Sequence, residues 1–198
     1  MRILGGQYKG HALKLPRGIR STSDKVRAAV FNILADAIEG ARFLDVCAGS
    51  GAIGLEALSR GAAAVTWIER EPACCTALTA NIERLGARLG AQLQVVRQEA
   101  PVALRQLGRR GAQFDLVFID PPYRDISLLK KALQAIFDHA ILPLTGWLIV
   151  EHDVRLDIVQ LIENIEVVGR YRYGDTALSV CRHADASHSH TTSSSSAA

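Results

Sequence analysis

Apolar and polar positions alternate in blocks between residues 43 and 120. Four short runs are apolar on both faces, a pattern typical of parallel strands that helices cover on both sides. These runs are FLDVC (43–47), AVTWIE (64–69), LQVVR (93–97) and FDLVFID (114–120). The segments between them, near 52–60, 72–85 and 100–110, predict helices. Pro72 suits a first helical turn and Gly86 suits the position after a last one.

The rest of the chain extends the same pattern. A helix is predicted near 127–138, followed by the strand WLIVEH (147–152) and by two terminal strands joined at Gly174-Asp175. We therefore expect an α/β fold with a doubly wound, mostly parallel sheet of seven strands and an antiparallel hairpin at one edge.

The first 40 residues predict a small appendage. MRILGG and HALKLP can pair as a β-hairpin across residues 7–10, and Ser23 can cap a helix. The apolar stripe of that helix comprises Val26, Val30, Ile33, Leu34, Ala37 and Ile38. We expect three regions: the appendage (1–40), the main domain (41–183) and a serine-rich, disordered tail (184–198).

Composition narrows the functional classes. The 198 residues are 48% apolar, which suits one packed domain, and they lack the long apolar run of a membrane span or secretory signal. A cytoplasmic protein that does not bind membranes is expected. The four cysteines have no CxxC spacing, so no metal site is expected. The net charge is +3, and residues 2–27 carry seven Lys and Arg against Asp24 alone, which favours a polyanionic partner.

A glycine-rich turn follows the first strand. Gly49-x-Gly51-x-x-Gly54 also fits the dinucleotide fingerprint, so a nicotinamide or flavin enzyme is an alternative. Asp45, at the end of the strand, favours S-adenosylmethionine because a carboxylate attracts a cationic amino-acid group and repels a pyrophosphate. The loop residues expected to bind the cofactor are Asp45, Ala48, Gly49, Ser50, Gly51 and Gly54.

Acids follow the next two strands. Glu69 ends the second strand, where nucleoside-binding folds place an acid for the ribose hydroxyls, and Glu71 competes for that role. Gln98-Glu99-Ala100 follows the third strand, where an acid or amide can face the adenine amino group. Arg70, Glu99 and Ala100 complete the expected cofactor site.

The fourth strand ends in Asp120-Pro121-Pro122-Tyr123. An exocyclic base amine is a poor nucleophile because its lone pair is delocalised, so a site must bind its N–H groups and orient it. Asp120 and the Pro121 carbonyl are suitable acceptors, and Tyr123 can stack on the base. We expect these four residues to form the catalytic site for amine methylation.

These motifs together resemble the amino-methyltransferases of class I, and more closely the bacterial RsmD-like family of 16S ribosomal RNA guanine-N2 methyltransferases. The segments that carry the resemblance are RILGGQYKGHALKLP, RSTSDKVRAAVFNIL (20–34), DVCAGSGAIGLEALSRGA (45–62) and DPPY. The chain departs from the family pattern at Ser21, Lys25, Ala28 and Cys47, where proline, arginine, glutamate and phenylalanine are usual.

The resemblance implies methyl transfer from S-adenosylmethionine to N2 of one guanine in 16S ribosomal RNA, within the small subunit or an assembly intermediate. It also implies that Arg20, Thr22, Lys25 and Arg27 engage the RNA. We expect a monomer.

Three other functions remain open from the sequence. A DNA adenine-N6 or other amino methyltransferase shares the DPPY motif, although such DNA enzymes usually carry a target-recognition domain for which this chain has little room. An NAD(P)-dependent oxidoreductase shares the glycine loop but has no evident use for DPPY. A noncatalytic RNA-binding assembly factor would not depend on Asp120.

Overall fold

The computed structural model describes residues 1–16, 22–87, 90, 92–163 and 165–184. Its strands are β1 (Arg42–Val46), β2 (Ala64–Glu69), β3 (Leu93–Arg97), β4 (Leu116–Ile119), β5 (Trp147–Asp153), β6 (Ile165–Tyr173) and β7 (Thr176–His183). Its helices are α1 (Asp24–Ile33), α2 (Ala52–Ser59), α3 (Pro72–Arg84), α4 (Ala100–Arg109), α5 (Ile126–Asp138) and a short 3₁₀ turn, η1 (Ile158–Gln160). The predicted order of strands and helices is confirmed.

All seven strands form one sheet in the order β3-β2-β1-β4-β5-β7-β6. The first five pair in parallel, while β7 runs antiparallel to β5 and β6. This is the doubly wound α/β fold that the apolar runs predicted. The strands are added on one side of β1 up to β3 and on its other side from β4 onward, so the strand order switches between β1 and β4. Such a switch point creates a ligand-binding crevice at the carboxyl ends of the strands.

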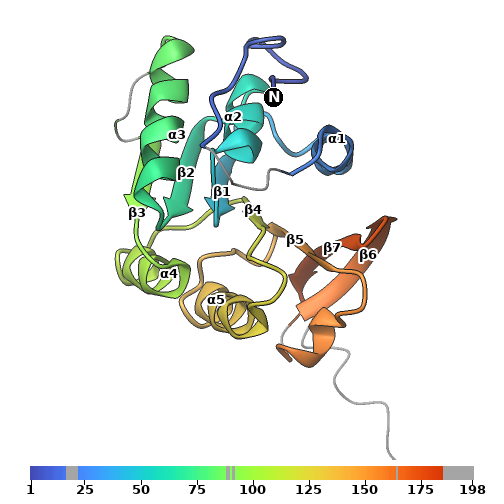
Figure 1. Cartoon of the computed structure of the whole chain (residues 1–198). Helices are drawn as coiled ribbons and strands as arrows, with labels where there is room; N and C mark the ends of the chain where they lie inside the picture. Colours follow the sequence, from blue (N-terminus) through green and yellow to red (C-terminus); the bar gives the residue numbers. More distant parts are fainter. Residues whose placement is uncertain (17–21, 88–89, 91, 164, 185–198) are drawn as a thin grey trace, which may run out of the picture.

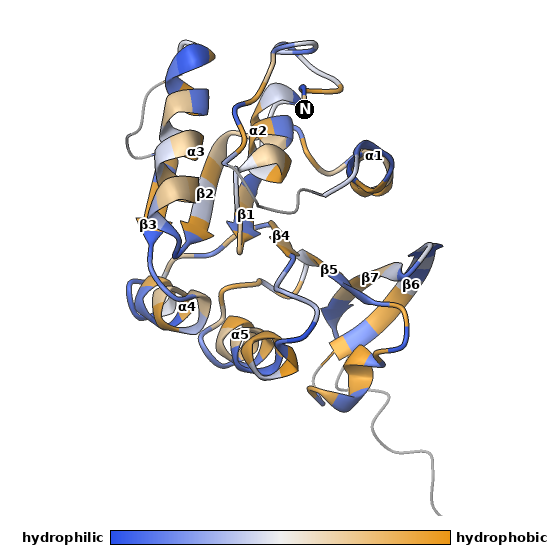
Figure 2. Ribbon diagram, viewed as in Figure 1, coloured by the Kyte–Doolittle hydropathy of each residue, from blue (hydrophilic) through white to orange (hydrophobic). Residues whose placement is uncertain are grey.

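Two apolar layers cover the sheet. Side chains of α1, α2 and α3 pack with Phe43 and Phe118 on one face, while those of α4 and α5 pack with Leu44 and Ile119 on the other. Figure 1 shows α4 and α5 on the side of the sheet opposite α1, α2 and α3. In Figure 2 these two helices carry hydrophilic residues on the side that faces away from the sheet.

The appendage shares this core, and two of its details differ from the prediction. Ser23 caps α1 as predicted, since its hydroxyl accepts from the Val26 N–H at 3.2 Å. The helix ends at Ile33 instead of continuing to residue 38, although Leu34 and Ile38 are still buried. The predicted hairpin is present only as a single bridge between Arg2 and Ala12, supported by the Ile3 N–H donating to the His11 carbonyl at 3.0 Å. The segment between them also bonds α2 through the Leu4 and Tyr8 N–H groups.

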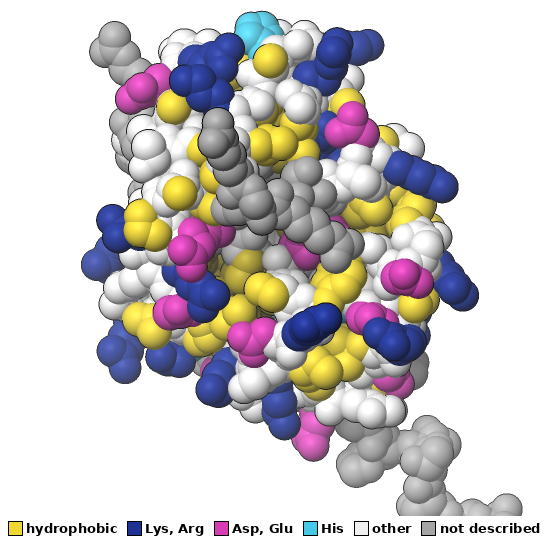
Figure 3. Space-filling model, in the orientation of Figure 1, with side chains coloured by type: hydrophobic (Ala, Val, Ile, Leu, Met, Phe, Trp, Pro, Cys, Tyr) yellow, Lys and Arg dark blue, Asp and Glu magenta, His cyan; other side chains and the backbone are white. Residues whose placement is uncertain are grey.

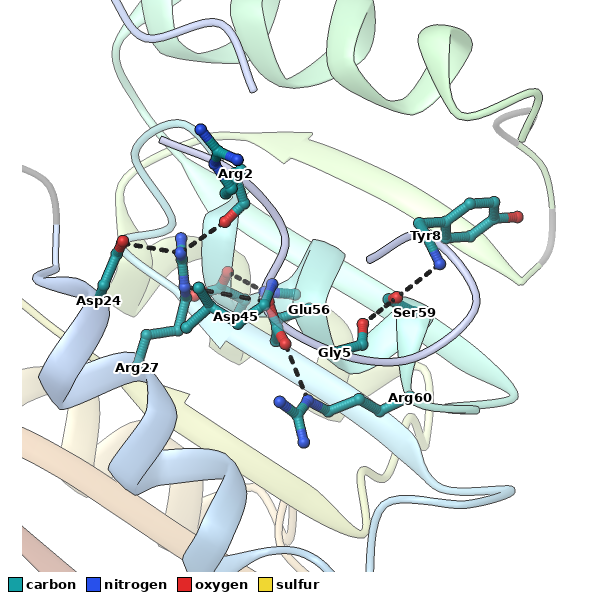
Figure 4. A network of polar contacts seen from close by, with 11 residues as sticks. Arg2, Gly5, Tyr8, Asp24, Arg27, Asp45, Glu56, Ser59 and Arg60 are labelled. Atoms are coloured by element: carbon teal, nitrogen blue, oxygen red, sulfur yellow. Dashed lines mark hydrogen bonds and ion pairs between the residues drawn. The ribbon is translucent and has the colours of Figure 1, made fainter. Parts of the chain in front are cut away.

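A buried ionic network holds the appendage on α2 (Figure 4). Glu56 of α2 is fully buried and accepts from the Leu4 N–H at 2.8 Å and from Arg60 Nε at 2.9 Å. Arg27 of α1 lies 3.9 Å from the same carboxylate and donates to the Arg2 carbonyl at 2.6 Å. These contacts fix the start of the chain and α1 relative to the glycine loop.

The tail expected from residue 184 lies almost wholly outside the described residues, as does Arg20. Within the described part of the chain, no helix has the length and apolar character needed to cross a bilayer.

Candidate functional site

A cavity of about 670 Å³ opens at the carboxyl edge of the sheet. Its wall includes residues at the ends of all five parallel strands and, among the described residues of the appendage, Thr22. Of the residues predicted from the sequence, those on the wall are Thr22, Gly49, Glu69, Arg70, Glu99, Ala100, Asp120, Pro121, Pro122 and Tyr123. The fold therefore brings both predicted clusters, for cofactor and for base, into one space.

The strand ends present their acids to the same side of the sheet. Side chains alternate along a strand, and Phe43, Trp67 and Phe118 pack on the α1–α3 face. Two residues further along these strands come Asp45, Glu69 and Asp120. This alternation places the three carboxylates on the face that α1 covers.

Asp45 lies behind the glycine loop. It is 2% exposed, and its Oδ2 accepts from the Gly54 N–H at 2.9 Å. Burial raises the pKa of Asp45 to about 7, and the charge of Glu69 adds to this effect against the opposing hydrogen bond from Gly54. Asp45 thus holds the start of α2 against β1, and it is not among the described residues on the cavity wall.

The loop glycines divide into two groups. Gly49 lies on the wall with φ of +55°, and a Cβ built there meets nothing within 4 Å. A Cβ on Gly54 would lie 2.1 Å from Trp67 Nε1, so this glycine allows α2 to approach β2. Four described residues of the loop do not line the cavity: Ala48, Ser50, Gly51 and Gly54. The structure therefore does not place them where they were predicted to contact the cofactor directly.

Glu69 is the acid that the fold presents to the cavity. It is 8% exposed, and its two oxygens accept from the Gly49 N–H at 2.7 Å and the Glu71 N–H at 2.8 Å. The side chain of Glu71 is 57% exposed and pairs with Arg70 at 3.3 Å. The buried, oriented carboxylate of Glu69 is therefore better suited to hold a ribose than that of Glu71.

The end of β3 closes this part of the cavity. Arg70 also bonds Glu99 at 3.2 Å, which links the ends of β2 and β3 across the opening. Ala100 begins α4 and is buried. Gln98 lines the cavity, and its buried Oε1 has no hydrogen-bond partner among the described residues. A buried acceptor of this kind suits a ligand that brings a donor.

Asp120 stands at the opposite side of the cavity, at the end of β4. Its backbone N–H donates to the Val46 carbonyl at 3.3 Å, which holds it beside β1. The Thr22 hydroxyl donates to Asp120 Oδ2 at 3.3 Å. The two prolines then turn the chain, and Asp125 caps α5 by accepting from the Leu128 N–H. The appendage thus reaches the predicted catalytic carboxylate directly.

Tyr123 is anchored by residues that the sequence analysis did not identify. Its hydroxyl donates to Glu151 Oε1 at 2.9 Å and lies 2.6 Å from Thr176 Oγ1. Glu151 belongs to β5, is 3% exposed and lines the cavity. A lone acid inside an apolar strand was the only signal in the sequence, and the neighbouring strands were needed to give it a place.

Cys47 also lines the cavity, with a left-handed φ of 62°. Burial, and then the charges of Glu69 and Asp120, raise the pKa of its thiol. A protonated thiol is a weak nucleophile, so the cysteine is an uncharged part of the wall.

The predicted RNA-contacting residues separate into different environments. Lys25 is exposed, and its Nζ lies 5.8 Å from the centre of the Tyr173 ring. Arg27 is fully buried, and burial lowers the pKa of its guanidinium. Arg27 was predicted to contact RNA, but its side chain is enclosed by Arg2, Asp24 and Glu56 and presents no exposed surface for such a contact. On the face of the molecule that Figure 3 shows, Lys and Arg side chains lie mostly around the periphery, with Asp and Glu side chains between them.

Comparison with known proteins identifies the relatives of this chain. The profile of the family described as "Conserved hypothetical protein 95" matches residues 1–182. The Ribosomal RNA small subunit methyltransferase D of Escherichia coli (strain K12) is 41% identical over 150 residues, which cover 75% of this chain and 69% of the relative. YlbH of Bacillus subtilis is 32% identical over 182 residues, covering 91% and 97%.

A solved structure of the Escherichia coli protein yhhF has a TM-score of 0.82 and 36% identity, covering 92% of this chain and 97% of the other. The match thus spans the appendage as well as the sheet. By sequence and by fold, the chain belongs to the Conserved hypothetical protein 95 family, to which the RsmD-like resemblance of its motifs had pointed.

Proposed function

We propose that this protein transfers a methyl group from S-adenosylmethionine to the exocyclic N2 amine of a guanine in 16S ribosomal RNA. The observation that carries the proposal is the single cavity that joins Gly49 and Glu69 to Asp120 and Tyr123. The name of the 41% identical Escherichia coli relative supports ribosomal RNA of the small subunit as the substrate. Because bacterial ribosomes are assembled in the cytoplasm, we propose that the protein is cytoplasmic.

The residues of the glycine-loop side fit S-adenosylmethionine. Glu69 offers an oriented carboxylate to the ribose, Gly49 leaves room for close approach, and Gln98 Oε1 offers a buried acceptor toward the adenine amino group. Glu99 and Ala100 lie beside Gln98 on the wall. Asp45 acts from behind the loop by holding the Gly54 N–H. SMU.776, which shares the fold with a TM-score of 0.62 at 16% identity, was crystallised with SAH.

The residues on the Asp120 side fit the chemistry of amine methylation. S-adenosylmethionine supplies an electrophilic methyl group. Asp120 accepts an N–H of the target amine and turns its lone pair toward that methyl, while its negative charge stabilises the cation that develops on the nitrogen. The proton leaves the nitrogen after methylation, with Asp120 as its first acceptor. Tyr123 stacks on the base, and Glu151 and Thr176 hold its hydroxyl.

Three residues of the appendage are proposed to engage the RNA. Thr22 lies on the cavity wall beside Asp120, and Lys25 is exposed one helical turn away on the same helix end. Arg20 belongs to this set by sequence alone, since it lies outside the described residues. Arg27 serves the same function indirectly by fixing α1 on α2.

The two alternative functions, a nicotinamide-dependent oxidoreductase and a DNA adenine methyltransferase, would use the cavity residues differently. A nicotinamide coenzyme could use Glu69 for its ribose, but its pyrophosphate would lie at the glycine loop, where the Gly49 N–H already donates to the Glu69 carboxylate. A DNA adenine methyltransferase would use the same Asp120 and Tyr123, and only the identity of the product distinguishes it.

The test is transfer of radiolabelled methyl from S-adenosylmethionine to small ribosomal subunits that lack base methylation, followed by nucleoside analysis. N2-methylguanosine is the expected product. N6-methyladenosine would overturn the assignment to guanine. If the protein binds S-adenosylmethionine but labels no RNA, the substrate class is wrong, whereas binding of NAD(H) with no binding of S-adenosylmethionine would overturn the cofactor assignment.

A further inference from the structure

Glu151 lies beside Asp120 at the ends of two neighbouring strands. In the parallel pairing of β4 with β5, Ile119 faces Val150, so Asp120 and Glu151 are the next residues along. Ile119 and Val150 pack on the α4–α5 face, and the alternation of side chains places both acids on the other face. The two carboxyl groups therefore enter the cavity side by side, on backbones about 4.8 Å apart.

The position of the Glu151 side chain is fixed. It is 3% exposed, and Oε1 accepts from the Tyr123 hydroxyl at 2.9 Å. The same hydroxyl contacts Thr176 Oγ1 at 2.6 Å, so Tyr123, Glu151 and Thr176 orient one another. A carboxylate has about four lone-pair positions on its two oxygens, so it can accept from more than one donor.

Holding Tyr123 does not by itself require a carboxylate. A neutral partner such as Thr176 can bind a phenol hydroxyl, whereas taking an ionised carboxyl group out of water costs several kcal/mol. Because Glu151 lines the same cavity as Asp120, its carboxylate can also accept a donor that the substrate brings.

The chemistry of the base provides this donor. The Watson–Crick edge of guanine presents the N2 amine and, next to it, the N1–H, so two donor groups lie side by side. Adenine has an acceptor at N1. Asp120 suits the amine in either base, but an adjacent carboxylate accepts the N1–H of guanine and repels the N1 lone pair of adenine.

We propose that Glu151 determines specificity by accepting the N1–H of the target guanine while Asp120 accepts the N2 amine. This inference depends on the proposed function, because it concerns the base that the same cavity receives. A polar group left unpaired in a closed site rejects the wrong ligand strongly, which is how two neighbouring carboxylates distinguish bases that differ at N1.

The experiment compares guanine with 2-aminopurine at the methylated position of 16S RNA, in subunits reconstituted from ligated RNA. The analogue keeps the 2-amino group but has an acceptor at N1 and lacks O6. For the wild type we expect kcat/KM on guanine to exceed that on 2-aminopurine by about 100-fold or more. In Glu151→Gln, whose amide can donate to N1, the ratio should fall to about tenfold or less.

Two controls separate reading of the base from support of Tyr123. Thr176→Val removes the other partner of the Tyr123 hydroxyl but keeps Glu151, so the guanine to 2-aminopurine ratio should stay at the wild-type value. Any effect of losing O6 applies to every variant and cancels when ratios are compared. Binding of S-adenosylmethionine verifies that each variant is folded.

The outcomes are distinct. If Glu151→Gln lowers both rates equally and leaves the ratio unchanged, Glu151 only supports Tyr123 and the inference is wrong. The same conclusion holds if Thr176→Val changes the ratio as much as Glu151→Gln. If wild-type protein methylates neither base, the proposed function itself fails, which the earlier transfer assay detects independently.

Discussion

The two sides of the cavity are built in different ways. The cofactor side, defined here by Asp45, Gly49, Gly54 and Glu69, satisfies its buried carboxylates with backbone N–H groups of one strand-to-helix turn and the next strand end. The base side, defined by Thr22, Asp120, Tyr123 and Glu151, depends on contacts between side chains of the segment before α1, the segment after β4, and the strands β5 and β7. Backbone contacts of a turn follow from local sequence, whereas contacts between remote side chains need the completed fold.

This difference has a functional meaning. A cofactor of constant structure suits a rigid site made by the backbone. A base within a large RNA has to be bound and selected, and side chains contributed by several segments, including the appendage, can respond to its identity. The following substitutions test the division between the two sides, in order of expected effect.

The largest effect is expected on the base side, from Asp120→Ala. Loss of the acceptor for the amine should lower kcat by about 100- to 1,000-fold, while the dissociation constant for S-adenosylmethionine changes by less than about twofold. Methyl transfer and equilibrium dialysis measure the two. Asp138→Ala, at the exposed end of α5, is the matched control. Retention of more than about a tenth of the activity would contradict the assigned role.

Arg27→Met should act on folding instead of on RNA contact. Removing one member of a buried ionic network destabilises a protein by about 3 kcal/mol, because Glu56 loses a counter-charge and the Arg2 carbonyl loses a donor. Urea unfolding measures the change in the free energy of unfolding. Lys25→Met on the same helix should cost less than about 1 kcal/mol. Unchanged stability with weakened RNA binding would restore Arg27 as an RNA contact.

The cofactor side should show a pH-dependent stability that originates at Asp45. Its pKa is raised from 3.8 to about 7 in the folded protein, so between these values the folded state binds the additional proton. Stability from this group is therefore present at low pH and is lost as the pH rises through this window. Relative to Asp45→Asn, the wild type should lose about 3 kcal/mol between about pH 4 and pH 7. If the free energy of unfolding depends on pH in the same way in both proteins, the pH dependence does not come from Asp45.

Two glycine substitutions distinguish packing from ligand contact within the cofactor side. Gly54→Ala should cost about 2 kcal/mol in stability, because its Cβ meets the Trp67 ring. Gly49→Ala should cost about 1 kcal/mol for its left-handed backbone and should weaken S-adenosylmethionine binding more than Gly54→Ala does. Calorimetry of folding and of binding gives both quantities. The reverse ranking for cofactor affinity would show that Gly54 is the ligand contact.

The smallest effect is expected from Lys25→Glu on the base side. Loss of one phosphate contact should weaken RNA binding severalfold and reduce the slope of log affinity against log salt by about 1. Stability and cofactor binding should not change. Lys131→Glu, exposed on α5 across the sheet, is the control. If the two variants bind RNA equally well, α1 is not part of the RNA-contacting surface.

Local sequence was sufficient to predict much of the cofactor side. The strands, the glycine loop and the acids Asp45 and Glu69 all follow from spacing within short segments, and Ser23 was correctly placed as a helix cap. The direct ligand contacts assigned to Gly54 and Asp45 were less well founded. Spacing indicates that a turn needs small residues, but it does not indicate whether the space is filled by a ligand or by Trp67.

The base side was predicted only in its consecutive residues. Asp120 to Tyr123 could be recognised as a unit, but the contact of Thr22 with Asp120 and the role of Glu151 could not, because their partners lie far away in the sequence. Arg27 illustrates the same limit. Among the many basic residues near the start of the chain it looked like one more surface charge, until the fold placed Glu56 against it.

The sequence by itself determined the order of helices and strands, and it led to the proposal that Asp120 to Tyr123 carry the amine chemistry, because both depend on periodicity or spacing among near neighbours. The tertiary structure alone decided which charges are buried, which acid accompanies Asp120 and how the appendage reaches the cavity. Burial and long-range pairing depend on which segments meet when the apolar faces pack together, and no short stretch of the chain contains that information.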